Sequence, residues 1–317
     1  MAEPAVAPAP SDLIAAIAAN LARVVHAPKE TLRMVVLCLV AEGHLIIEDF
    51  PGVGKTMLAK ALARSLDCSF SRLQFTPDLL PSDVTGVNVF SQKTNEFEFR
   101  AGPVFANLLL VDEVNRASPK TQAALLECMQ ESQVTVDGVS YPLERPFMVM
   151  ATQNPIEYEG TYPLPEAQLD RFTMRVALGY PPLADEAKML DEQTHVPPLD
   201  SLEPVAAAGD VLRLAAQARD VYVEESLGRY VVALLRQTRS DPRLYLGASP
   251  RSGIALLRVA KALALADGRE YLVPDDVKAI AGAVLSHRLI LAPEARSAGL
   301  EGEAIVAEAL EKTPVPV

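Results

Sequence analysis

Short apolar runs alternate with helical patterns through the first half of the chain. Five runs have the length and composition of buried strands: Leu45 to Ile47, Phe70 to Phe75, Asn107 to Asp112, Phe147 to Thr152 and Phe172 to Val176. Helical segments such as Met57 to Arg64 separate several of them. This alternation predicts a parallel sheet with helices on its faces. Ligands of such sheets bind beyond the carboxyl ends of the strands.

Two segments interrupt the alternation with the pattern of β-hairpins. Residues 85–101 alternate apolar and polar positions around a polar turn, and residues 133–145 do so around Asp137-Gly138, a favoured two-residue turn. The second pattern places Val134, Val136, Val139 and Tyr141 on one face. Surface ornaments and functional insertions fit these two patterns equally well.

The pattern becomes helical beyond Tyr180. Residues 197–204 are rich in proline and are expected to form a linker. Ser249 is expected to cap a helix that ends at Asp267-Gly268, and Pro274 is expected to begin another. We therefore predict three parts: a flexible tail over residues 1–11, an α/β domain over residues 12–195 that carries both hairpins, and a helical lid domain over residues 196–317.

The composition is that of a globular chain without the charge of a nucleic-acid-binding protein. Half of the 317 residues are hydrophobic and 22% are charged, enough for about two domains with a large core. A net charge of -12 and a pI near 4.9 weigh against nucleic acid as a partner, because that binding depends on Lys and Arg.

The cysteines, histidines and N-terminus narrow the picture further. Cys38, Cys68 and Cys128 have no C-x-x-C spacing, and the four histidines form no cluster with them, so we expect reduced core thiols and no Cys/His metal site. The proline-rich start lacks the apolar core of a signal peptide, and no run approaches the ~18 residues that span a bilayer. We expect a cytoplasmic protein that does not insert into membranes.

The segment that joins the first apolar run to its helix has the features of a phosphate-binding loop. Gly52 and Gly54 would let backbone N–H groups approach an anion at a helix start. Lys55 would reach the outer phosphates, and the Thr56 hydroxyl would ligate Mg²⁺. Asp49 stands where the pattern G-x-x-x-x-G-K-[ST] has glycine, but Asp tolerates unusual backbone angles well, so we expect the loop to form. A glycine turn before a helix is the alternative.

Polar side chains follow two of the later apolar runs. Asp112 ends one run, where Mg²⁺ needs a carboxylate, and Glu113 could polarise an attacking water as a general base. Asn154 follows the next run and could hold that water or the γ-phosphate in line. A solvated strand end and an Asn-Pro turn are the alternatives for these two segments.

Two arginines complete the set of candidate residues. Arg171 could act as an arginine finger, which usually comes from a neighbouring subunit; the alternative is a surface arginine anchored by Asp170. Arg251 lies in the first turn of its helix, where the macrodipole disfavours cations by several tenths of a kcal/mol. We therefore expect an anion beside it, either a nucleotide phosphate or a carboxylate of the fold.

Five segments in this order resemble the motifs of the MoxR family of AAA+ ATPases, and the resemblance extends from about residue 12 to residue 295. They are Pro51 to Thr56, Val111 to Ala117, Ala151 to Pro155, Leu164 to Phe172 and Gly247 to Arg251. The resemblance implies a P-loop AAA+ core with a parallel five-stranded sheet and an all-α lid. It identifies the two hairpins as the helix-2 insert and the pre-sensor-1 hairpin.

The resemblance also assigns roles to single residues. It implies ATP binding by Pro51, Gly52, Val53, Gly54, Lys55, Thr56, Met57 and Asp112, with Mg²⁺ held by Thr56 and Asp112. It implies that Glu113, Asn154, Arg171 and Arg251 are the catalytic base, sensor 1, arginine finger and sensor 2. Arg116, directly after the second motif, is a further candidate to face a neighbouring nucleotide.

Family membership would imply a hexameric ring that uses ATP to remodel, activate or assist metal-cofactor maturation of client proteins. Its partner would be a separate chain with a von Willebrand factor A domain, because this sequence contains no D-x-S-x-S motif. The alternatives are a magnesium-chelatase-like motor subunit, a motor that acts on nucleic acid and a nucleotide-gated scaffold. The acidic pI argues against the second, and the complete set of catalytic candidates argues against the third.

Overall fold

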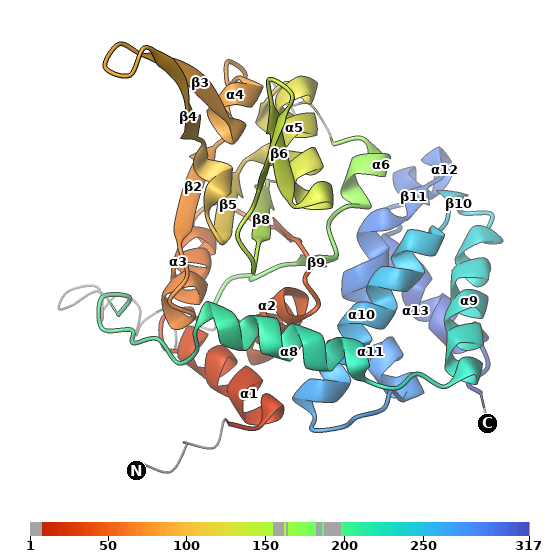
Figure 1. Ribbon diagram of the computed structural model, residues 1–317. Helices are drawn as coiled ribbons and strands as arrows, with labels where there is room; N and C mark the ends of the chain where they lie inside the picture. The colour runs from red at the N-terminus through yellow and green to blue at the C-terminus, as the bar shows by residue number, and fades with distance from the viewer. Residues whose placement is uncertain (1–7, 155–161, 163, 182–185, 187–197, 317) are drawn as a thin grey trace, which may run out of the picture.

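A five-stranded parallel sheet forms the centre of the molecule (Figure 1). The computed structural model describes residues 8–154, 162, 164–181, 186 and 198–316. The strands follow the order β2-β5-β8-β1-β9 across the sheet, and every neighbouring pair is parallel. Their bounds are β1 Leu45–Glu48, β2 Phe70–Gln74, β5 Leu108–Asp112, β8 Met148–Gln153 and β9 Met174–Val176. Each strand lies within two residues of a predicted run, which confirms the predicted parallel sheet.

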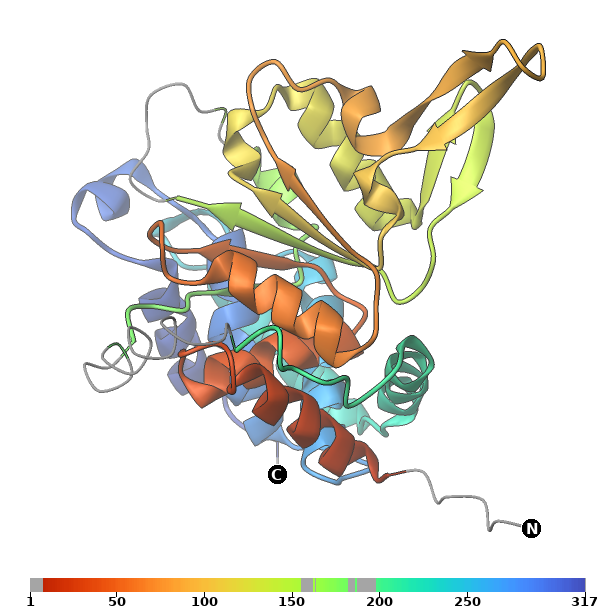
Figure 2. The ribbon, with the colours of Figure 1, turned by 90° about the vertical axis from the view of Figure 1, so that its left-hand side faces the viewer.

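The side chains of this sheet divide into two buried layers. Leu45 and Ile47 of β1 join one hydrophobic cluster and Ile46 joins the other, because successive side chains of a strand point to opposite faces. Figure 2 shows helices on both sides of the sheet. The first cluster contains α1 (Pro10–Leu21), α2 (Lys29–Val40) and α3 (Lys55–Ser65); the second contains residues of α4 (Pro81–Thr85) and α5 (Pro119–Glu131).

Two antiparallel hairpins extend from the second layer. The first pairs β3 (Gly86–Ser91) with β4 (Glu96–Ala101) and projects from the core in Figure 1; the second pairs β6 (Gln133–Val136) with β7 (Val139–Pro142). Between the hairpins lie the short helices η1 (Pro103–Phe105) and η2 (Val114–Arg116). The hairpins touch: Asn88 donates a hydrogen bond to Asp137 over 2.7 Å, and the rings of Phe99 and Tyr141 stack with centroids 4.0 Å apart.

The C-terminal region is helical, as predicted, and packs beside β9 and the first helical layer. Its elements are α8 (Ala208–Asp220), α9 (Glu225–Arg239), α10 (Pro250–Ala266), α11 (Pro274–Leu285), η3 (Ser286–Arg288), α12 (Pro293–Ser297) and α13 (Gly302–Lys312), with a short antiparallel pair of β10 (Leu244–Leu246) and β11 (Ile290–Leu291). Ser249 caps α10 by accepting a hydrogen bond from the Ser252 N–H over 3.2 Å, and Gly268 takes a positive φ beyond its end.

Some sequence boundaries differ from the structure or lie outside its described part. Helix α1 begins at Pro10, so residues 10 and 11 of the predicted tail are helical, because proline's fixed φ suits a first helical turn. Residues 1–7, Pro155 and the predicted boundary at 195/196 lie outside the described residues. Among the described helices, none is long and apolar enough to cross a membrane.

Candidate functional site

The loop after β1 has the backbone of an anion-binding loop. Gly52 and Gly54 have φ of 87° and 96°, values that favour glycine, and no atom lies within 4 Å of a Cβ built on either, so the space over the loop is open. Helix α3 begins at Lys55 with Gly54 as its N-cap, without a capping side chain and without an acidic residue in its first turn. Its first N–H groups are therefore available for an anion.

Asp49 stabilises the loop by a mechanism that the sequence analysis missed. It is not among the described residues with positive φ, so tolerance of unusual backbone angles is the wrong explanation for its presence. The buried carboxylate instead accepts hydrogen bonds from the backbone N–H groups of Leu178 and Gly179, over 2.6 and 2.7 Å, and from that of Phe50 over 2.8 Å. A glycine here could not tie the loop to the chain that follows β9.

Lys55 lies among the acidic groups of the site. Its Nζ donates a hydrogen bond to the Asp49 carbonyl oxygen over 2.5 Å. Burial lowers the pKa of Lys55, and the charges of Asp49, Asp112 and Glu113 oppose that shift. The phosphate loop and the carboxylates that end β5 thus meet at one edge of the sheet.

Asp112 and Glu113 are held by β2 and β8, the neighbours of β5. Arg72 of β2 forms an ion pair with Asp112 over 2.6 Å, and Gln74 of β2 donates to Glu113 over 2.8 Å. Glu113 has a positive φ of 56°, and its N–H donates to the Thr152 hydroxyl over 3.0 Å. The same hydroxyl lies 3.2 Å from Asp112 Oδ1, to which it donates, so one buried side chain fixes both carboxylate residues.

Two further predicted residues lie at this edge. Asn154 is half-buried and directly follows the end of β8, the strand beside β5. Arg116 ends η2 and forms an ion pair with Glu113 over 3.1 Å. The structure therefore brings together the phosphate loop, both carboxylates and Asn154, as the sequence predicts for residues that follow parallel strands.

The oxygen donors at this edge fit Mg²⁺. Thr56 offers a hydroxyl in the first turn of α3, and Asp112 offers a carboxylate at the end of β5; Lys55 lies close enough to Asp112 to respond to its charge. Mg²⁺ prefers such oxygen ligands and usually takes the remainder from phosphates and water. Within the described residues there is no group of three or more His, Cys, Asp and Glu side chains that could hold a metal.

Arg171 and Arg251 lie at the opposite edge of the same sheet. Arg171 precedes β9, whose first residue pairs with Leu45 at the start of β1, whereas the phosphate loop follows the end of β1. A strand of four residues separates the two edges by about 13 Å. Ser249, the cap of the helix that carries Arg251, donates to Asp170 over 3.2 Å, which places Arg251 at the same edge as Arg171.

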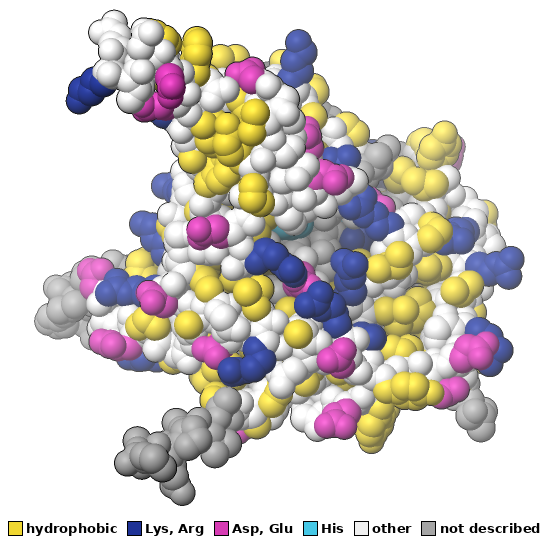
Figure 3. Space-filling model, in the orientation of Figure 1, with side chains coloured by type: hydrophobic (Ala, Val, Ile, Leu, Met, Phe, Trp, Pro, Cys, Tyr) yellow, Lys and Arg dark blue, Asp and Glu magenta, His cyan; other side chains and the backbone are white. Residues whose placement is uncertain are grey.

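The hydrogen bonds between the start of α10 and Asp170 hold Arg251 away from the phosphate loop of its own chain. The alternative for Arg171 was a surface arginine held by Asp170. In the structure the Asp170 carboxylate instead forms an ion pair with Arg288 over 2.9 Å. Figure 3 shows Lys and Arg side chains gathered around a hollow in the middle of the face that it draws.

Three further residues of this site, Arg72, Gln74 and Thr152, are not among the predicted site residues. A signal for the first two was present, because polar residues two apart in β2 must share one face of the sheet. Thr152 gave no signal of its own, since a threonine near the end of a buried strand is ordinary.

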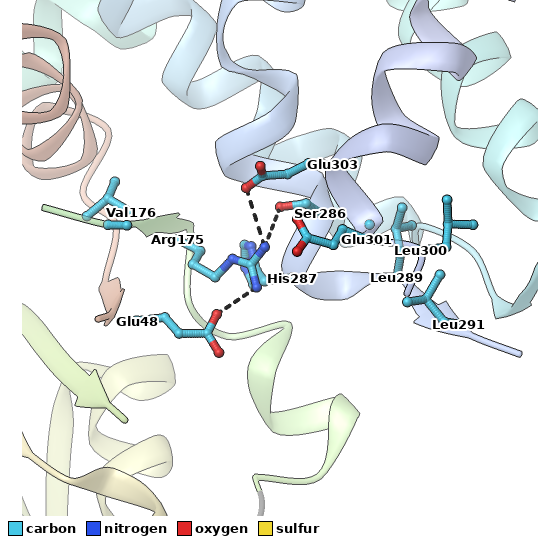
Figure 4. A pocket seen from close by; sticks show the side chains of 12 residues that line it. Glu48, Arg175, Val176, Ser286, His287, Leu289, Leu291, Leu300, Glu301 and Glu303 are labelled. Carbon is cyan, nitrogen blue, oxygen red and sulfur yellow. Dashed lines mark hydrogen bonds and ion pairs between the residues drawn. The ribbon is translucent and has the colours of Figure 1, made fainter. Parts of the chain in front are cut away.

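A cavity of about 590 Å³ lies beside this site, between the end of β1, β9 and the lid (Figure 4). Arg175 reaches into it and donates to Glu48 over 2.7 Å, to Ser286 over 3.3 Å and to Glu303 over 3.5 Å. The lining includes none of the glycines of the phosphate loop. The cavity therefore lies where the core meets the lid and is distinct from the phosphate-binding edge.

The buried histidines and cysteines have structural roles. His44 accepts a hydrogen bond at Nδ1 from the Val149 N–H and donates from Nε2 to the Met129 carbonyl, both over 3.0 Å. Burial, with a smaller contribution from the Arg251 charge, lowers the pKa of His44 to about 4, while the hydrogen bond to Met129 opposes this shift. Burial raises the pKa of Cys128 to about 12, so that thiol stays protonated. All three cysteines are free.

Comparisons with known proteins agree with this geometry. Residues 44–174 match the family described as the ATPase family associated with various cellular activities (AAA), and residues 236–309 match the AAA lid domain. The chain is 49% identical to the uncharacterized protein YeaC of Bacillus subtilis, over 94% of this chain and 93% of YeaC. It is 39% identical to the chaperone MoxR1 of Mycobacterium tuberculosis, over 93% of this chain and 80% of MoxR1. A crystal structure ascribed to an ATPase of Cytophaga hutchinsonii is similar with a TM-score of 0.90 and 38% identity, over 97% of this chain and 96% of that one.

Proposed function

Because the chain belongs to the MoxR family of AAA+ ATPases, we propose that it hydrolyses ATP with Mg²⁺ in a hexameric ring whose active sites are shared between neighbouring copies. One observation carries the shared site: Arg171 and Arg251 lie at the edge of the sheet opposite to the phosphate loop. A ring of head-to-tail contacts brings that edge of one copy against the loop of the next.

Each residue of the phosphate-binding edge has a defined task in this scheme. The loop N–H groups and Lys55 bind the triphosphate, and Thr56 and Asp112 would hold Mg²⁺, which neutralises charge on the phosphates. Glu113 takes a proton from the attacking water, and Asn154 orients that water or the γ-phosphate. Thr152 keeps the Glu113 backbone in its left-handed conformation by accepting its N–H.

The neighbouring copy contributes the positive charge that the reaction needs. Arg171 and Arg251 of that copy neutralise the charge that develops on the transferred phosphoryl group. Three exposed apolar side chains lie near Arg251 along the chain: Tyr245 and Leu246 on β10, and Ile254 one helical turn further on α10. Exposed apolar groups around a functional arginine support a surface that another copy covers.

The energy of hydrolysis is used to remodel, activate or mature a client protein. The relative MoxR1 is named a chaperone, which supports this role for the present chain. We also propose a separate partner with a von Willebrand factor A domain, because the metal-binding motif of that domain is absent from the sequence. The free thiols agree with a cytoplasmic location.

The substitution Glu113→Gln tests the proposed chemistry. It should lower the ATPase rate at saturating ATP by about 100-fold or more, since a general base contributes 10²- to 10⁴-fold, and it should leave ATP binding unchanged. Phosphate release measures the rate, and a fluorescent ATP analogue measures binding. Both measurements are made with and without Mg²⁺. Glu131→Gln, at an exposed site on α5, is the control and should turn over normally. Wild-type turnover by Glu113→Gln would refute its role as the base.

A further inference from the structure

Asp170 connects three segments that are far apart in the sequence. Its Oδ1 accepts from Arg288 Nε over 2.9 Å and from the Ser252 hydroxyl over 3.4 Å, and its Oδ2 accepts from the Ser249 hydroxyl over 3.2 Å. One carboxylate therefore joins the segment before β9, the start of α10 and η3.

Arg288 makes this junction rigid. Its side chain is only 3% exposed, and besides Asp170 it donates to the carbonyl oxygens of Phe172, over 2.7 Å, and Thr173, over 3.1 Å. His287, the preceding residue, lies 3.1 Å from the Phe172 carbonyl through its Nε2. A buried guanidinium needs a carboxylate partner, because an uncompensated charge in the interior is strongly destabilising.

The residues bound by Asp170 are the chain neighbours of the two arginines. Arg171 directly follows Asp170, and Arg251 lies between Ser249 and Ser252 on the first turn of α10. Arg171 Nε is buried without a hydrogen-bond partner among the described residues, so that nitrogen does not fix the orientation of the side chain. Asp170 thus holds the backbone segments that carry both guanidinium groups.

We propose that Asp170 is a positioning residue that fixes Arg171 and Arg251 as one unit directed at the nucleotide of the neighbouring copy. This inference rests on the shared site proposed above. The two arginines come from segments far apart in the sequence, yet in the shared site they must meet one triphosphate. A carboxylate suits the junction because its two oxygens accept from all three donors, whereas an amide offers a single oxygen. A displacement of about 1 Å can cost about 100-fold in rate, so rigid placement matters for turnover.

The substitution Asp170→Asn tests this role. It should lower kcat by about 10- to 100-fold and leave binding of a fluorescent ATP analogue within about two-fold of wild type, because the phosphate loop is untouched. Asp276→Asn is the matched control, since Asp276 likewise pairs with an arginine, Arg269, over 2.6 Å at the start of the next helix. It should lower the melting temperature and leave kcat unchanged.

Mixed rings separate positioning from a loss of folding. Subunits with Lys55→Ala lack a working phosphate loop but keep Asp170, so mixing them with Asp170→Asn subunits should give more activity than the sum of the two alone. If Asp170→Asn does not fold, the double variant Ser249→Ala and Ser252→Ala keeps the ion pair with Arg288 and removes only the link to α10; it should show the same rescue with a smaller loss of kcat.

Two results overturn the inference. One is wild-type kcat for Asp170→Asn. The other is failure of Lys55→Ala subunits to rescue Asp170→Asn while they do rescue Arg171→Ala, which would leave the shared site intact and remove only the role of Asp170. If Arg171→Ala is not rescued either, the proposed shared site fails as well.

Discussion

At the scale of single residues, the environment of a side chain decides more than its match to a motif. Asp49 occupies a position where the general phosphate-loop pattern has glycine, yet its carboxylate accepts three backbone hydrogen bonds in a buried place. Glu113, by contrast, fits its motif but has an unfavourable backbone conformation. It takes a left-handed conformation that is uncommon for glutamate, and the Thr152 hydroxyl offsets part of that cost by accepting its N–H.

The substitution Asp49→Gly brings the loop closer to the general pattern and should nevertheless weaken the protein. It removes the acceptor of three N–H groups, of which that of Leu178 is buried, so we expect the free energy of unfolding to fall by about 2 to 3 kcal/mol. Denaturant unfolding measures this, and the KM for ATP should rise because the loop loses its tie to residues 178 and 179. Asp49→Asn keeps one oxygen acceptor, so its free energy of unfolding and its KM should lie between those of the wild type and Asp49→Gly. A glycine variant as stable as wild type would show that these bonds contribute nothing net.

At the scale of elements, buried polar side chains determine how strands and helices are joined. The apolar runs predicted all five sheet strands to within two residues, because a buried parallel strand is apolar along its whole length. The docking of the lid was not predictable in this way. It includes the Asp170–Arg288 pair, whose members are 118 residues apart, and no local pattern joins them. Arg171 and Arg251 were therefore candidates from the sequence, but the sequence did not predict at which edge of the sheet they lie.

The buried imidazole of His44 predicts a loss of stability in weak acid. It joins the start of β1 to α5 and β8, and burial lowers its pKa from 6.5 to about 4. The unfolded chain takes up a proton near pH 6.5 and the folded chain does not, so this contribution is complete above pH 6.5 and is lost as pH falls towards 4. The loss is on the order of 3 kcal/mol. The burial of His287 lowers its pKa in the same direction.

Thermal melts from pH 7.5 to pH 4.5 measure this effect. The melting temperature of the wild type should fall over that range. His44→Gln, whose amide can both accept from Val149 and donate to Met129, should give a shallower dependence on pH. Equal slopes for the two proteins would show that His44 does not titrate as the structure indicates.

At the scale of the whole molecule, the candidate catalytic residues lie at two opposite edges of the sheet. The phosphate loop, both carboxylates and Asn154 lie at the carboxyl ends of the strands, and Arg171 and Arg251 lie near the amino ends. The acidic net charge of -12 does not oppose this arrangement, because the positive charge required by phosphates is local. In the proposed function a single copy is incomplete as a catalyst, and assembly into a ring would complete each site.

The most direct test of this account is the ATPase rate of rings mixed from two inactive variants. Lys55→Ala removes the binding half of the site and Arg251→Ala removes the arginine half. If the halves come from different copies, a site is complete wherever an Arg251→Ala subunit presents its loop to a Lys55→Ala subunit, which is roughly one quarter of the sites in an equal mixture. We expect recovery of about that fraction of the wild-type rate. A mixture no more active than its two components would contradict a site shared between copies.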